Sequence, residues 1–91
     1  MSKGDTTQGV RVELNKEYPL PIEMGEYGKN PEDGLWYFRT PASGFGIGNL
    51  ASHDITEYED GTITVSPSIL VYGSHNRTWH GYLKKGIWCE V

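Results

Sequence analysis

The sequence predicts a small, single-domain, all-β protein, built as an antiparallel β-meander or sandwich. Two observations predict this class. Aromatic and β-branched segments alternate with turn signals, of which Asp60-Gly61 is the clearest, and no stretch longer than about ten residues has the 3.6-residue period of an amphipathic helix. The length of 91 residues suits one domain, which we place at residues 10–91.

Aromatic residues are expected to supply much of the core. A chain of this length buries only about two thirds of the surface that its unfolded form exposes. Three Trp, six Tyr and two Phe compensate, since each ring can bury roughly 150–250 Å².

The first nine residues, MSKGDTTQG, contain almost no apolar anchors, and we expect a flexible arm there. An edge strand should follow at 10–14, where Val10, Val12 and Leu14 alternate with charged residues. A further strand is predicted at 35–39, between Gly34 and Pro41, and it should place Trp36 and Phe38 on one face.

Two hairpins are predicted in the second half of the chain. A two-residue turn at Asp60-Gly61 would pair Tyr58 with Ile63 and Thr56 with Val65, so that Tyr58, Ile63 and Val65 share a face. Pro67 cannot donate a ladder hydrogen bond, which predicts a bend at 66–68 before the apolar strand 69–72. The second hairpin has arms 78–83 and 87–91. Its turn, Lys84-Lys85-Gly86, fits either a two-residue or a three-residue loop with Gly86 left-handed.

Charge and composition exclude several classes of protein. A net charge of −4 and scattered basic residues disfavour a nucleic-acid or anionic-membrane surface. The single cysteine, Cys89, excludes an intrachain disulfide framework. No segment resembles a signal sequence or a membrane span, so we expect a cytoplasmic protein with neither a nucleic-acid nor a membrane partner.

The segment SPSILV at 66–71, followed after a loop by HGYLKKGI at 80–87, resembles a family of small phage and prophage proteins of unknown function. Members of that family have an upstream knuckle of the form C-P-x-C-G and a third cysteine before the histidine. Here the knuckle corresponds to TPASG at 40–44, with Thr40 and Ser43 at the cysteine positions, and Trp79 precedes His80. The resemblance covers about half the chain.

The family pattern implies a structural zinc site with three cysteines and one histidine. Of these ligands only His80 is kept, because hydroxyls are not soft anionic ligands and an indole does not ligate zinc. The resemblance therefore implies a degenerate, metal-free zinc-knuckle domain without cofactors. In it Trp79 would fill the former metal volume, while Thr40 and Ser43 would form hydrogen bonds within the knuckle.

The remaining candidate sites are weak. The glycines of Gly44–Gly48 lack the Lys-Ser/Thr and the helix of a phosphate-binding loop. A metal site from His53, His75, His80 and Asp54 is disfavoured by the five-residue spacing of the last two histidines. Cys89 or Ser74 could pair with a histidine as a nucleophile, but no third orienting group is identifiable.

We expect a protein-binding module that is not an enzyme and whose partner is a host or phage protein. Trp36, Tyr37, His80 and Tyr82 are the candidate binding residues, and Thr40, Ser43, Trp79, Gly61 and Gly86 the structural ones. One alternative is a virion or assembly component that forms homo-oligomers through exposed aromatics. The other is a small hydrolase that uses His80.

Overall fold

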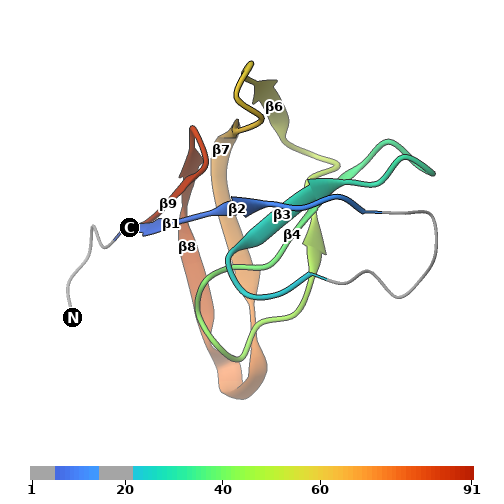
Figure 1. Cartoon of the computed structure of the whole chain (residues 1–91). Coiled ribbons are helices and arrows are strands. Elements are labelled where there is room, and N and C mark those ends of the chain that lie inside the picture. Colours follow the sequence, from blue (N-terminus) through green and yellow to red (C-terminus); the bar gives the residue numbers. More distant parts are fainter. Residues whose placement is uncertain (1–5, 15–21) are drawn as a thin grey trace.

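The computed structural model describes residues 6–14 and 22–91 of the chain, and it confirms the all-β class (Figure 1). The strands form two sheets. The larger sheet has the order β1-β9-β8-β7-β6 and is antiparallel throughout, and the smaller has the order β2-β3-β4-β5. The strands of the larger sheet are β1 (Thr6–Gln8), β6 (Asp54–Glu57), β7 (Ile63–Tyr72), β8 (Thr78–Lys84) and β9 (Ile87–Glu90).

The smaller sheet consists of β2 (Val10–Arg11), β3 (Glu26–Lys29), β4 (Trp36–Phe38) and β5 (Gly48–Asn49). β2 is an edge strand, as expected, but it is shorter than the predicted strand at 10–14 and runs parallel to β3. β4 confirms the aromatic strand, since Trp36 and Phe38 are both buried on one face. A short 3₁₀ turn, η1 (Ser74–Asn76), connects β7 to β8.

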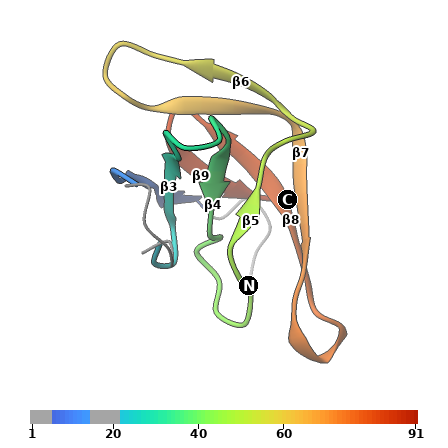
Figure 2. The same ribbon diagram turned by 90° about the vertical axis from the view of Figure 1, so that its right-hand side faces the viewer.

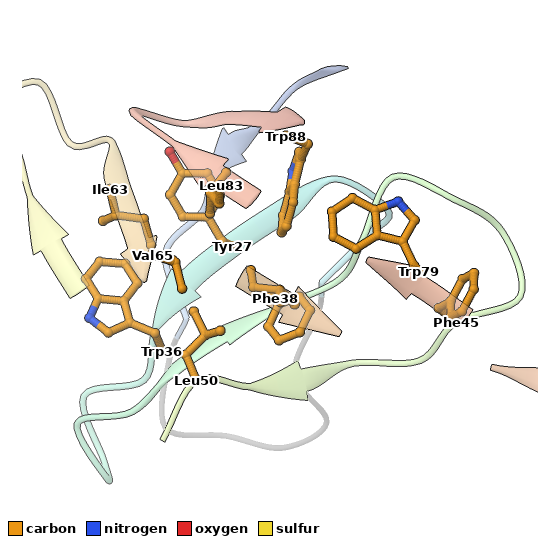
Figure 3. Close-up of a cluster of buried hydrophobic side chains, with 11 residues drawn as sticks. Tyr27, Trp36, Phe38, Phe45, Leu50, Ile63, Val65, Trp79, Leu83 and Trp88 are labelled. Atoms are coloured by element: carbon orange, nitrogen blue, oxygen red, sulfur yellow. The ribbon is translucent and has the colours of Figure 1, made fainter. Parts of the chain in front are cut away.

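The core lies between the two sheets and is rich in aromatic rings, as expected (Figure 3). Phe38 of the smaller sheet lies 6.0 Å from Trp88 of the larger one, measured between ring centroids. The Trp88 indole also donates a buried hydrogen bond of 2.9 Å from Nε1 to the Gly25 carbonyl. Because a buried indole N–H without a partner would be costly, this bond fixes the ring while joining the two sheets.

Arg11 makes a second connection between the sheets. Its Nη1 donates to Glu57 Oε2 at 2.7 Å and to the Gly61 carbonyl at 3.0 Å. The same guanidinium stacks 5.0 Å from the centroid of the Trp36 ring. Arg11 therefore covers one end of the core and attaches β2 to the turn between β6 and β7.

The N-terminal segment departs from the expected flexible arm. Residues 1–5 of the predicted arm lie outside the described residues, whereas Thr6–Gln8 forms β1 and pairs with β9. The Gly9 amide donates to the Gly86 carbonyl at 2.8 Å. The pairing was missed because the free edge of β9 offers backbone partners to any extended segment, whatever its side chains.

The register of the β6–β7 hairpin differs by one residue from the prediction. Glu57 pairs with Ile63 and Ile55 with Val65, while the Tyr58 amide donates to the Thr62 carbonyl. The loop therefore has three residues and ends on Gly61 at φ +91. A one-residue shift reverses the faces of one strand, so the predicted shared face of Tyr58, Ile63 and Val65 is wrong.

The β8–β9 hairpin has the shorter of its two predicted turns. Lys84 pairs with Ile87, which leaves Lys85 and Gly86 as a two-residue loop with φ of +48 and +78. Positive φ at both positions is the type I′ geometry that suits the twist of a two-residue hairpin.

The predicted bend at Ser66–Ser68 is present as an irregularity within β7. The register of β7 against β8 shifts between Val65 and Ile69, and Figure 2 shows the strand turning there. The half of β7 before the bend pairs with both β6 and β8, whereas the half after it pairs with β8. The bend thus directs the end of the β7–β8 hairpin away from β6.

Candidate functional site

The most prominent surface feature is the side of the larger sheet that faces away from the core. Cross-strand pairing places Leu70 beside His80 and Tyr72 beside Thr78. Their neighbours in sequence, Ile69 and Trp79, point into the core, as the alternation of a strand requires. We call this surface the outer face, and it comprises Leu70, Tyr72, His80, Tyr82 and Cys89.

Two apolar side chains of the outer face are well exposed. Leu70 is 51% exposed and Tyr72 is 74% exposed. Tyr82 and Cys89, which are opposite each other on β8 and β9, are half-buried. The solvent side of an antiparallel sheet is ordinarily polar, so this combination of aromatic and aliphatic side chains needs an explanation.

A polar cluster centred on Ser68 borders the outer face. His80 Nε2 lies 2.9 Å from Ser68 Oγ, and His53 Nε2 lies 3.1 Å from the Ser68 carbonyl oxygen. His53 is thereby fixed at the bend of β7. Its other ring nitrogen, Nδ1, is buried and has no hydrogen-bond partner among the residues that the structure describes.

The contact between Ser68 and His80 joins a hydroxyl to a general base, which is the first requirement of nucleophilic catalysis. Catalysis of that kind also needs a group that orients the histidine and donors for an oxyanion. In the described part of the chain no carboxylate bonds to His80, whose side chain is exposed. The arrangement fits a surface hydrogen bond better than a catalytic pair.

Lysines lie over two tyrosines near the β8–β9 turn. Lys84 Nζ is 4.8 Å from the ring centroid of Tyr82, and Lys85 Nζ is 5.4 Å from that of Tyr58. A cation over a tyrosine face is attracted by the ring quadrupole. The outer face consequently has a positively charged margin at Lys84.

Two of the four predicted binding residues lie elsewhere. Trp36 is only 8% exposed and belongs to the core beneath Arg11, so its indole is not accessible to a partner. Tyr37 is half-buried on the smaller sheet, and its hydroxyl donates to Asp33 Oδ2 at 2.7 Å. That bond lowers the pKa of the Asp33 carboxyl. Of the four predicted binding residues, only His80 and Tyr82 lie on the outer face.

The residues at the family's zinc-ligand positions do not converge. Thr40 is fully buried at 0% exposure, whereas Ser43 is exposed. Trp79 points into the core, and His80, the next residue of the same strand, lies on the outer face. Within residues 6–14 and 22–91, no three or more His, Cys, Asp or Glu side chains are grouped so that they could hold a metal ion. These residues therefore do not fit a tetrahedral zinc site.

The Thr40 hydroxyl does not form the hydrogen bond within the knuckle that the sequence predicted. Thr40 Oγ1 is buried without a hydrogen-bond partner in the described residues. The segment after it packs against the β7–β8 connection, where the Ser74 amide donates to the Gly44 carbonyl at 3.3 Å. Arg77 stacks there on Phe45, with 5.3 Å between the guanidinium carbon and the ring centroid. The knuckle segment thus has a packing role.

The two glycines predicted to be structural both occupy hairpin turns. Gly61 has φ +91, and a Cβ added there would approach the Arg11 side chain no closer than 3.7 Å, so its constraint is conformational. Gly86 combines φ +78 with crowding, because a Cβ would lie 2.9 Å from Thr62 Cγ2 and 3.0 Å from the Tyr27 hydroxyl. Both positions therefore favour glycine.

Sequence reasoning missed Ser68, Leu70 and Tyr72 as members or neighbours of the exposed face. A signal was present: once Trp79 is assigned to the core, alternation places His80 and its cross-strand neighbours on the opposite side. Finding Leu70 opposite His80 also required the register between β7 and β8, which the bend at Pro67 shifts.

Comparisons with known proteins found no matching family model, no matching curated protein and no matching solved structure. The resemblance to small phage proteins stays a prediction. In the part of the chain that the structure describes, no helix is long and apolar enough to cross a membrane.

Proposed function

We propose that this chain is a protein-binding module that contacts its partner through the outer face. The observation that carries the proposal is the exposure of Leu70 and Tyr72, at 51% and 74%, beside His80 and Tyr82 on a sheet surface. Exposed apolar patches bordered by polar residues are typical of protein interaction sites, and tyrosine is enriched in them.

The border of the outer face supports the same proposal. Ser68 supplies a hydrogen-bonding group at the edge, where its hydroxyl contacts His80 of the outer face, and Lys84 supplies a charge near Tyr82. Apolar and aromatic side chains with a polar and charged margin are the usual organisation of a protein interface. These side chains project from the paired strands β7 and β8, and an interface on a preformed sheet needs less ordering of the backbone on binding.

The proposed partner is a host or phage protein in the cytoplasm. This part of the proposal rests on the resemblance of the SPSILV segment to small phage proteins and on the charge of −4, which disfavours nucleic acid. Binding is favoured over catalysis. The hydrolase alternative has the 2.9 Å contact between Ser68 and His80 in its favour but lacks an orienting group within the described residues.

Affinity capture from a lysate of the cells that make the protein tests the proposal. Leu70→Ser should weaken capture of the partner at least about tenfold, the size expected for loss of an anchor at an interface. Ile47→Ser is the matched control, because Ile47 is 43% exposed in the loop before β5. Equal capture by both variants would place the partner surface elsewhere.

A further inference from the structure

The backbone of β7 has a free edge beyond its bend. Before the bend, the Tyr58 amide donates to the Thr62 carbonyl. Hydrogen-bonded pairs alternate in an antiparallel ladder, so Thr64 bonds to Thr56 and Ser66 to Asp54, and the even-numbered residues of β7 face β6. At Ser68 the strand partner is replaced by the His53 side chain, which bonds to the carbonyl oxygen. Beyond Ser68, β7 has a strand partner on one side, β8.

The direction of the backbone groups at Leu70 and Tyr72 follows from the ladder. The Gly73 amide donates to the Arg77 carbonyl at 2.8 Å, in the same register as the pair Val71–Trp79. Hydrogen-bonded pairs alternate in an antiparallel ladder, so Ile69, Val71 and Gly73 bond to β8. The N–H and C=O groups of Leu70 and Tyr72 therefore point away from β8. They have no partner in the described part of the chain.

This edge lacks the features that ordinarily prevent strand pairing. Pro67 and the irregularity at 66–68 protect the edge only up to Ser68. From Ile69 to Tyr72 the strand is apolar and carries no charge or proline. Figure 2 places this half of β7 at the margin of the molecule, and the end of the β7–β8 hairpin projects beyond the smaller sheet in Figures 1 and 2.

We propose that the free edge of β7 pairs with the same edge of a second copy of this chain. An antiparallel arrangement with its two-fold axis at Val71 places Leu70 of each copy opposite Tyr72 of the other copy. The two copies together have four outward N–H groups, those of Leu70 and Tyr72 in each chain, and each of them then meets an outward C=O group of the other copy. The contact is therefore self-complementary and closed. It also places each exposed Leu70 beside an exposed Tyr72, an aliphatic–aromatic cross-strand pair.

The second copy is favoured over an unrelated strand because the edge matches itself without a change of conformation. The contact is small, so the dimer should form at high protein concentration rather than persist on dilution. The backbone groups of the free edge carry this inference, and the contact of Leu70 with Tyr72 adds to it. It does not depend on the proposed binding of a partner protein. In the dimer the two outer faces would lie on the same side of one continuous sheet.

Amide hydrogen exchange of the full chain, measured by NMR from about 10 µM to about 1 mM, tests the proposal in the range where small interfaces associate. The Leu70 and Tyr72 amides should exchange at least about tenfold more slowly at the highest concentration than at the lowest. The Val71 amide, bonded to β8, should be protected throughout. Sedimentation should show the shift from monomer to dimer over the same range.

Leu70→Pro removes one outward N–H group and should leave the protein monomeric at about 1 mM, since proline is tolerated where an edge N–H faces solvent. Leu70→Lys keeps that group but adds a charge, and it provides a second monomeric variant should the proline impair folding. Any of three results would overturn the proposal: a monomer at about 1 mM, a dimer without protection of Leu70 and Tyr72, or protection of both amides in the dilute monomer.

Discussion

The indole rings of Trp79 and Trp88 meet edge to face, with ring centroids 5.6 Å apart and planes inclined by 85°. Trp79 is 2% exposed and Trp88 1% exposed. This arrangement is the favourable one for two aromatic quadrupoles. It joins adjacent strands β8 and β9 at the inner surface of the larger sheet, directly behind the outer face.

Truncation of Trp79 should therefore remove a large part of the stability. We expect Trp79→Ala to lower the free energy of unfolding by roughly 3–5 kcal/mol, the range for a buried aromatic, which approaches the total for a small domain. Tyr72→Ala, at a site that is 74% exposed, is the control and should cost much less. Urea denaturation of both variants checks this, and similar costs would show that Trp79 is not a core residue.

Removal of metal should not affect folding. Of the four zinc-ligand positions only His80 carries a zinc ligand, and it lies on the face of β8 opposite the buried Trp79. Structural zinc is coupled to folding only where its ligands are complete. We expect EDTA to leave the melting temperature unchanged. Stoichiometric zinc found by elemental analysis, together with loss of the folded circular-dichroism spectrum on chelation, would contradict this expectation.

The buried hydroxyl of Thr40 should be dispensable. Its Oγ1 has no hydrogen-bond partner in the described residues, and a buried polar group without a partner costs about 1–3 kcal/mol. Thr40→Val keeps the shape of the side chain and removes that cost, so the urea midpoint should stay the same or rise. A clear loss of stability would reveal that the hydroxyl has a partner, such as a buried water.

The turn at Gly61 should require glycine for conformational reasons. Valine at φ +91 is strained, and we expect Gly61→Val to destabilise the protein by about 1–3 kcal/mol. Gly46 is a suitable control, since its φ is not left-handed and a Cβ there would meet nothing within 4 Å. If Gly61→Val and Gly46→Val shift the urea midpoint equally, the turn geometry is wrong.

Local sequence patterns predicted those parts of the fold that depend on local chemistry. Alternation and turn residues were enough to predict the aromatic strand around Trp36 and the hairpin whose turn contains Gly86. The β6–β7 register was wrong because Asp60-Gly61 suits both a two-residue loop and the last two positions of a three-residue loop. In the latter, hydrogen bonds from the Thr62 hydroxyl and amide to Asp60 stabilise the turn and lower the pKa of its carboxyl.

The pairing of strands that are distant in the sequence could not be predicted from such local patterns. The parallel contact of Val10 with Glu26, and the addition of Thr6–Gln8 to β9, depend on which edges the folded sheets leave open. The same limit applies to the candidate site. His80 and Tyr82 could be placed on one surface from alternation within β8 alone. Leu70 could not be added without the shifted register after Pro67, and burial of Trp36 depends on packing between sheets.

Site-specific photo-crosslinking tests the proposed function most directly. A photoreactive phenylalanine analogue at position 72, on the outer face, should crosslink the full chain to a partner protein from the lysate. The same analogue at position 47, exposed on the loop before β5, should not do so. Adducts of equal yield at both positions, or an adduct at position 47 alone, would contradict the claim that the outer face is the binding surface.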